Sequence, residues 1–170
     1  MSDLYVSWSE YHQLIENLAA QIYQSQWQFN QIVCLARGGL RIGDILSRIF
    51  NKPLGILSTA SYHGEAGNIR GELKIASHIT MTTETLINPV LLVDDLVDSG
   101  VSLEQSLMWL KQHYSTLEDI RTAVLWYKAC SSIKPNYYVT YLSDNPWIHQ
   151  PFEPYERLNP AEIKTNYNPV

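Results

Sequence analysis

The stretch Val90-Leu-Leu-Val-Asp-Asp-Leu-Val-Asp-Ser-Gly-Val-Ser102 decides the fold of this chain. Residues 90–93 are apolar and predict a buried strand. Asp94 and Asp95 follow this strand directly, and Asp98 comes three residues later. The run 99–102 then leads into a sequence with helical spacing of apolar residues. A strand that ends in such a loop and opens a helix presents free backbone N–H groups and the positive end of the helix dipole. The stretch therefore predicts a phosphate site.

The acids beside this loop need an explanation, because carboxylates repel a phosphate. Two roles are consistent with their position: binding ribose hydroxyls, and holding a Mg²⁺ ion that bridges to phosphates. Acids that only cap a helix after a strand are the plainer alternative. Receiver domains and phosphatases also carry acids at strand ends, but they give no reason to expect Asp-Ser-Gly-x-Ser directly afterwards.

The order of hydrophobic strand, Asp-Asp, two residues and Asp-Ser-Gly-x-Ser resembles the phosphoribosyl-pyrophosphate loop of type I phosphoribosyltransferases. The resemblance implies that Asp94 and Asp95 hold the ribose hydroxyls and that Asp95 also holds Mg²⁺. It implies that Asp98 faces the imidazole side of a base and exchanges its proton. The 5′-phosphate would lie among the residues of the loop itself: Ser99, Gly100, Val101 and Ser102.

A second loop of the same design precedes the acidic one. An apolar run over 32–36 predicts a strand, Arg37-Gly38-Gly39 follows it, and residues 40–50 have the apolar spacing of a helix. Glycines let the backbone approach a ligand closely, and Arg37 adds positive charge. The loop resembles the pyrophosphate-binding loop of the same family, with Arg37 and Gly38 as ligands. The family often holds a non-proline cis peptide there, which would be Ala36–Arg37.

Other patterns complete the expected framework. Ser7 and Glu10 form a capping box before an amphipathic helix, and Ser102 with Gln105 suggests a second one. Strands are expected over 55–60, 121–127 and 137–141. Residues 61–74 are polar and glycine-bearing, and the resemblance implies a mobile lid. Its catalytic cation would be Arg70, with Lys74 as the rival.

The C-terminal part shows which group within this family the chain resembles most. Trp147-Ile-His-Gln-Pro-Phe-Glu153 resembles the segment that closes the purine pocket of bacterial xanthine-guanine phosphoribosyltransferases. The resemblance implies that Trp147 stacks on the base, that the Ile148 backbone reads its 2-position, and that Lys128, at a strand end, donates to a 6-oxo group. His149 stands where the enterobacterial enzyme has an acid, so a changed preference at the 2-position is expected.

Composition and charge argue against several other classes of protein. The 170 residues suit one domain, and 12 Lys and Arg against 17 Asp and Glu give a net charge of −5. A nucleic-acid binder would be basic, so no nucleic-acid partner is expected. Cys34 and Cys130 form no CxxC pair, which favours a reduced, cytoplasmic setting. No signal peptide, membrane span or zinc-ligand spacing is visible.

We therefore expect an α/β fold with a mainly parallel sheet flanked by helices. A single domain would cover 1–157, including a small C-terminal hood (142–157), and a tail would follow over 158–170. The substrates implied are phosphoribosyl pyrophosphate and a 6-oxopurine (xanthine, hypoxanthine or guanine), with Mg²⁺ as cofactor, in a homo-oligomer. Two alternatives stay open: an enzyme of this fold that acts on another base, and a nucleotide-sensing regulator that binds RNA.

Overall fold

The computed structural model describes residues 3–61 and 73–165. Its main sheet has seven strands, which run parallel to their neighbours except for the antiparallel pair β3 and β4. The expectation of a mainly parallel sheet is confirmed. The strands are β2 (Gln31–Ala36), β3 (Leu54–Ser61), β4 (Leu73–Ile75), β5 (Val90–Val93), β6 (Leu96–Val97), β7 (Ile120–Lys128) and β8 (Tyr137–Leu142).

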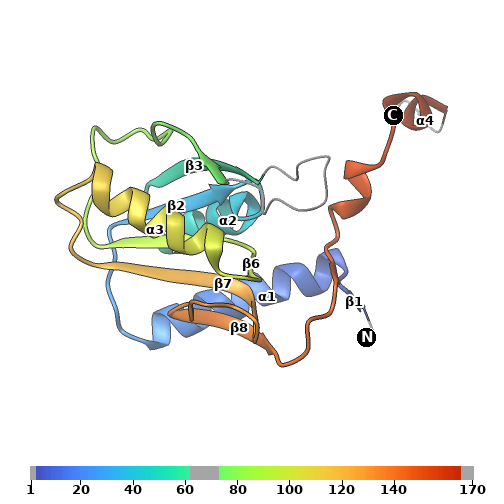
Figure 1. Cartoon of the computed structure of the whole chain (residues 1–170), viewed down its shortest axis with the longest axis horizontal. Helices are drawn as coiled ribbons and strands as arrows, with labels where there is room; N and C mark the ends of the chain where they lie inside the picture. Colours follow the sequence, from blue (N-terminus) through green and yellow to red (C-terminus); the bar gives the residue numbers. More distant parts are fainter. Residues whose placement is uncertain (1–2, 62–72, 166–170) are drawn as a thin grey trace.

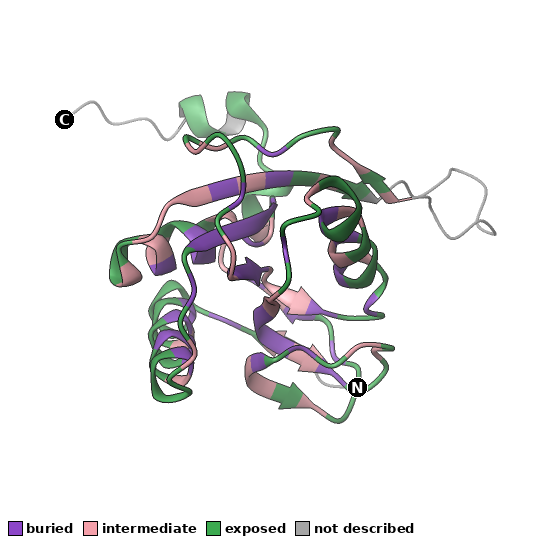
Figure 2. Cartoon of the chain, turned by 90° about the vertical axis from the view of Figure 1, so that its left-hand side faces the viewer, coloured by how far each residue is buried: buried purple, intermediate pink, exposed green. Residues whose placement is uncertain are grey.

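Helices cover both faces of this sheet (Figure 1). Helices α1 (Trp8–Gln24) and α2 (Leu40–Phe50) contribute to one apolar core, and α3 (Val101–His113) contributes to the other. Strand β2 supplies both cores, because Ile32 and Cys34 belong to the first and Val33 and Leu35 to the second. Every residue of β2 and β5 is buried, as a parallel sheet between two helical layers requires. Figure 2 shows these buried strands between helices whose outer sides are exposed.

The two expected capping boxes had different outcomes. At α1 the box is present: Ser7 is the N-cap, its hydroxyl accepts from the Glu10 N–H, and the Glu10 carboxylate accepts from the Ser7 N–H. At α3 the prediction was wrong. The N-cap is Gly100, with no side-chain hydrogen bond, so Ser102 is already inside the helix.

A second, smaller sheet joins the two ends of the chain. Strand β1 (Leu4–Tyr5) pairs in parallel with β9 (Ile148–His149), and backbone bonds from Leu4 to Trp147 and from Val6 to His149 extend the pairing. A 3₁₀ helix η1 (Glu153–Glu156) follows, and helix α4 (Pro160–Thr165) then extends away from the body (Figure 1). The C-terminal part is thus more regular than its sequence indicates.

No helix within residues 3–61 and 73–165 is long and apolar enough to cross a membrane.

The contact between α2 and β2 gives a stability prediction. A Cβ atom at Gly43 would lie 2.6 Å from Cys34 Cβ, an atom fixed in a central strand. Gly43→Ala should lower the free energy of unfolding by about 2 kcal/mol, because overpacking costs about 1–3 kcal/mol and exceeds the gain in helix propensity. Urea denaturation measures the change.

Ser47→Ala, on the same helix, is the matched control. Ser47 is only partly buried, so this change should stay within about 0.5 kcal/mol of wild type. A Gly43→Ala protein as stable as the wild type would contradict the close packing described here.

Candidate active site

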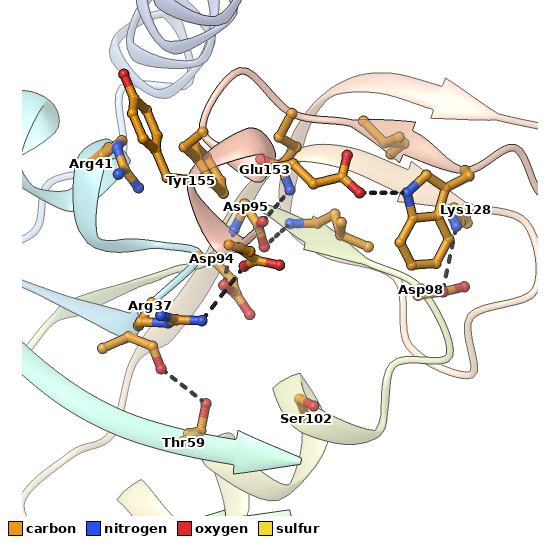
Figure 3. Close-up of a pocket in the computed structure, with 18 residues that line it drawn as sticks. Arg37, Arg41, Thr59, Asp94, Asp95, Asp98, Ser102, Lys128, Glu153 and Tyr155 are labelled. Atoms are coloured by element: carbon orange, nitrogen blue, oxygen red, sulfur yellow. Dashed lines mark hydrogen bonds and ion pairs between the residues drawn. The ribbon is translucent and has the colours of Figure 1, made fainter. Parts of the chain in front are cut away.

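A cavity of about 550 Å³ lies where β2, β5 and β7 end at their carboxyl termini (Figure 3). Ligands of open parallel sheets bind at this edge. The cavity is also lined by the β9–η1 segment, so residues far apart in sequence surround one space. Seven of the expected site residues outside the acidic pair line it: Arg37, Gly38, Asp98, Ser102, Lys128, Trp147 and Ile148.

Asp94 and Asp95 lie at an interruption in the sheet. Strands β5 and β6 both pair with β7, and the two acids separate them. The Asp94 N–H donates to the carbonyl of Ala123 at 3.1 Å, and the Asp95 carbonyl accepts from the N–H groups of Leu125 and Trp126 at 2.9 and 3.2 Å. The backbone of the acidic pair is therefore fixed by β7, while both side chains line the cavity.

Two hydrogen bonds hold the Asp95 carboxylate. Its Oδ1 accepts from the Leu96 N–H at 2.8 Å, and its Oδ2 accepts from Gln150 Nε2. A Cβ atom at residue 38 would lie 2.5 Å from Asp95 Oδ1, so only glycine at that position leaves the carboxylate where it is. Sequence reasoning assigned no role to Gln150, although the Trp-Ile-x-Gln-Pro pattern contained it.

The acidic pair has the character of a cation site. Burial raises the pKa of the Asp94 carboxyl well above its usual range, and the neighbouring Asp95 raises it further. Within the described residues, no cluster of three or more His, Cys, Asp or Glu side chains could hold a metal. One or two carboxylates are nevertheless what Mg²⁺ takes from proteins that bind it together with substrate phosphates. Asp95 and Asp94 therefore fit Mg²⁺ as partial ligands.

Lys128 and Asp98 form an ion pair at one end of the cavity. Lys128 Nζ lies 3.4 Å from Asp98 Oδ2, and the lysine side chain is 6% exposed while that of Asp98 is 54% exposed. The Cys130 thiol lies 3.3 Å from Asp98 Oδ1; burial and this contact raise the pKa of the thiol, so it donates as a neutral group. The pair presents a buried donor beside an accessible acceptor.

Trp147 and Ile148 enter the cavity from β9 and the residue before it. The Trp147 side chain is exposed, and its Nε1–H donates to Glu153 Oε1 at 3.1 Å. Glu153 lines the same cavity. A flat apolar ring thus lies in the same cavity as the Lys128–Asp98 pair.

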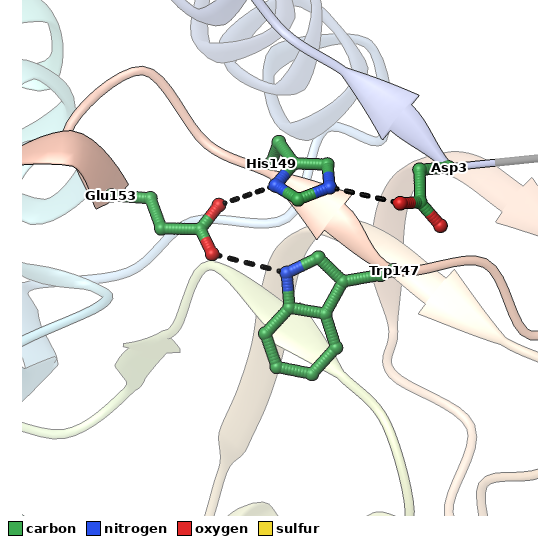
Figure 4. A network of polar contacts seen from close by, with 4 residues as sticks. All are labelled: Asp3, Trp147, His149 and Glu153. Carbon is green, nitrogen blue, oxygen red and sulfur yellow. Dashed lines mark hydrogen bonds and ion pairs between the residues drawn. The ribbon is translucent and has the colours of Figure 1, made fainter.

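The His149 side chain, at the position expected to change the preference at the 2-position, does not line this cavity. Successive residues of a strand point to opposite sides, and Ile148 and Gln150 take the side that lines the cavity. The His149 ring lies on the other side, between Asp3 and Glu153 (Figure 4).

The loop after β2 brings positive charge to the cavity. The Ala36–Arg37 bond is cis, as predicted. Arg37 lies 3.5 Å from Glu156 in an exposed ion pair. Arg41 also lines the cavity, with its guanidinium 4.3 Å from the centre of the Phe152 ring. Sequence reasoning missed Arg41, although a second arginine one helical turn after Arg-Gly-Gly was a usable signal.

The expected phosphate loop surrounds a neighbouring cavity of about 210 Å³. Ser99, Gly100 and Ser102 line it together with the acids, whereas Val101 does not. Gly100 has φ +89°, and a Cβ there would lie 2.7 Å from Ser131 Oγ, so glycine is required. Because α3 has no side-chain cap, its first N–H groups remain available to an anion.

Of the expected lid, residues 61–74, the structure describes only residues 61, 73 and 74. Arg70 and residues 62–72 lie outside the described residues. Lys74 belongs to β4, is exposed, and lines neither of these two cavities.

Comparisons with known proteins agree with this geometry. The chain is 30% identical over 155 residues to a xanthine-guanine phosphoribosyltransferase of Gluconobacter oxydans (strain 621H), covering 87% of this chain and 83% of the relative. A purine phosphoribosyltransferase of Pyrococcus horikoshii superposes with a TM-score of 0.73 at 28% identity, covering 90% and 95% of the two chains. The xanthine-guanine-hypoxanthine phosphoribosyltransferase of Helicobacter pylori shares the fold, with a TM-score of 0.75 at 22% identity over 96% and 99%.

The family model for the phosphoribosyl transferase domain matches residues 7–157, which include every described element that lines the two cavities. With this match, the chain belongs to the phosphoribosyltransferase family and has its type I fold.

Proposed function

We propose that this chain transfers the phosphoribosyl group of phosphoribosyl pyrophosphate to a 6-oxopurine. The bond from C1′ to the pyrophosphate oxygen breaks, a bond from C1′ to a ring nitrogen of the purine forms, and that base gives up one proton. The observation that carries the proposal is the buried Lys128 paired with Asp98, in one cavity with Trp147 and the acidic pair. The xanthine-guanine phosphoribosyltransferase relative supports it.

Base recognition follows from the chemistry of three side chains. Lys128 has only donors, so it matches the 6-oxo group of hypoxanthine, guanine or xanthine and mismatches the 6-amino group of adenine. Asp98 is accessible and accepts the proton of the imidazole nitrogen that faces it. Trp147 covers the ring face, and the Ile148 backbone faces the 2-position.

Phosphoribosyl transfer needs charge stabilisation and positioning more than a covalent nucleophile, because the ribosyl group becomes cationic as its bonds loosen. Asp94 and Asp95 bind the ribose hydroxyls beside this developing charge. Arg37 stabilises the departing pyrophosphate, and Mg²⁺ held by Asp95 would supply further positive charge there. The loop of Ser99, Gly100, Val101 and Ser102 holds the 5′-phosphate. Arg70 is the cation we assign to the lid.

The first prediction concerns Asp95. Asp95→Asn should lower Mg²⁺-dependent turnover about a hundredfold or more, the scale of losing one charge-stabilising group. The melting temperature should stay close to wild type, because the Asp95 side chain faces a cavity and not the apolar core. Pyrophosphate release and thermal denaturation, measured on the same preparation, check both statements.

Asp44→Asn is the matched control for that experiment, since Asp44 pairs with Arg48 on the exposed side of α2. It should keep wild-type turnover. Full activity in Asp95→Asn, or its unfolding under assay conditions, would refute the assignment.

The second prediction concerns base choice. A lost charge-assisted hydrogen bond is worth about 1.5–3 kcal/mol, and an unpaired buried charge adds to it. Adenine should therefore have a kcat/KM about a hundredfold or more below the best 6-oxopurine, since about 1.4 kcal/mol corresponds to tenfold. Lys128→Gln should compress this ratio, because an amide can either donate to a 6-oxo group or accept from a 6-amino group.

The control for this change is Lys134→Gln, at an exposed lysine near the Tyr138 ring. It should leave the preference among adenine, hypoxanthine, guanine and xanthine unchanged. Adenine as the best substrate of the wild type would overturn the role of Lys128. Absence of turnover with all four bases, alongside transfer to another acceptor, would favour the alternative of an enzyme for a different base.

A further inference from the structure

The His149 side chain lies at the centre of a polar network that ends in the active-site cavity (Figure 4). Its Nδ1 lies 2.9 Å from Glu153 Oε2, and its Nε2 lies 3.1 Å from Asp3 Oδ2. The other oxygen of Glu153 accepts from the Trp147 indole at 3.1 Å. The network therefore runs from the N-terminal segment to the exposed ring that faces the cavity.

The contacts of this ring determine its protonation state. Ionised carboxylates only accept hydrogen bonds, whereas a neutral imidazole has a single N–H. Both ring nitrogens of His149 face carboxylate oxygens, so both contacts are hydrogen bonds only when the ring is an imidazolium. The hydrogen bond to Asp3 raises the pKa of His149 above its ordinary value, and the contact with Glu153 raises it further.

The surroundings of the ring reinforce this charge state. It stacks on Tyr5, with centroids 4.3 Å apart and planes 13° apart, and it lines a cavity of about 650 Å³ on the outer side of β9. The titratable and charged groups that face it come from the N-terminal segment, α1, η1 and the residue after η1: Asp3, Tyr5, Glu10, Glu153 and Arg157. Carboxylates outnumber the single arginine, which favours the cation.

The Trp147 ring depends on this network for its orientation. Trp147 is 59% exposed, so packing fixes its ring weakly, and within the described residues its indole N–H donates to Glu153. Glu153 in turn is oriented by His149. The hydrogen bond from Trp147 lowers the pKa of the Glu153 carboxyl, and His149 lowers it further, so Glu153 stays ionised as an acceptor for both.

We propose that His149 is a positioning residue: through Glu153 it fixes the Trp147 ring for base binding, and through Asp3 it ties that ring to the N-terminal strand. This role rests on the proposed function, because the ring it fixes is the one assigned to the base. His149 itself contacts no substrate, since its side chain lies outside the catalytic cavity.

The pH dependence has a definite sign. Because the pKa of His149 is raised in the folded chain, the network is complete below the ordinary histidine pKa of about 6.5. It is lost as pH rises through the higher folded value, when one ring nitrogen loses its proton. Above that pH His149 keeps only one of its two hydrogen bonds, so Glu153 and the Trp147 ring bonded to it are held less firmly, and the KM for the base should rise.

A test that needs no substrate is nuclear magnetic resonance of the free protein. The ¹⁵N indole signal of Trp147, assigned by its absence in Trp147→Phe, should titrate with the same midpoint as the His149 ring. In His149→Phe, which keeps a flat ring over Tyr5 but has no donor, this titration should be absent. The wild-type titration alone decides the coupling if that variant fails to fold: an indole signal that does not follow His149 overturns the proposal.

Kinetics test the consequence for binding. His149→Phe should raise the KM for the base about fivefold, the scale of a partly exposed hydrogen bond, with kcat and the KM for phosphoribosyl pyrophosphate changed by less than about twofold. An unchanged KM for the base would overturn the positioning role. The control is His113→Phe, because His113 also stacks on an aromatic ring, Trp109, but lies at the far end of α3.

These experiments separate the positioning role of His149 from the proposed function. An indole signal coupled to His149 in a chain that transfers phosphoribosyl to no purine would refute the proposed function and keep the network. A chain that uses purines while its indole signal ignores His149 would keep the function and refute the positioning role.

Discussion

The structure depends on keeping two adjacent carboxylates, Asp94 and Asp95, side by side at the end of a buried strand. Burial disfavours the charged form of Asp94, and the neighbouring Asp95 disfavours it further, which is why the pKa of Asp94 is raised. Backbone N–H groups offset part of this cost: that of Asp95 donates to Asp94, and that of Leu96 donates to Asp95. The apolar cores on both faces of the sheet supply the stability that offsets the remaining cost of burying the two carboxylates.

Other features of the site follow from this pair. A side chain at residue 38 would displace the Asp95 carboxylate, which occupies the space that a Cβ atom would need. Gln150 reaches from the C-terminal segment to the same carboxylate, so the part of the cavity that we propose for the base is joined to the acidic pair. The pairing of β1 with β9 and the His149 network fasten that segment to the N-terminal strand. Both ends of the chain thereby contribute to one site.

The sequence predicted the elements in which several consecutive residues indicate the same structure. The buried strands have continuous apolar runs, so β2, β3, β5, β7 and β8 lie within a residue or two of their expected positions. Both loops after β2 and β5 border the cavities as expected. Strands β1, β6 and β9 have two residues each and β4 has three, which is too short for any periodicity to show. Their partners are distant in sequence and become visible only in the fold.

The features that the sequence did not predict share a physical origin. Each depends on the direction in which the backbone or a side chain points, which residue composition does not determine. Ser102 has the spacing of an N-cap, yet the positive φ of Gly100 starts the helix earlier. His149 belongs to a segment that closes the cavity, yet the alternation of β9 turns its ring outward. Gln150 and Glu153 were visible in the motif, but their contacts with Asp95 and Trp147 depend on how the C-terminal segment folds back.

A crystal structure with inosine monophosphate bound would test where the base and the phosphate lie. We expect Lys128 Nζ within hydrogen-bonding distance of the purine 6-oxygen, Asp98 facing the imidazole side, the Trp147 ring on the purine face and the phosphate among residues 99–102. A nucleotide whose base lies away from Lys128 and Trp147, or whose phosphate lies outside that loop, would contradict this expectation.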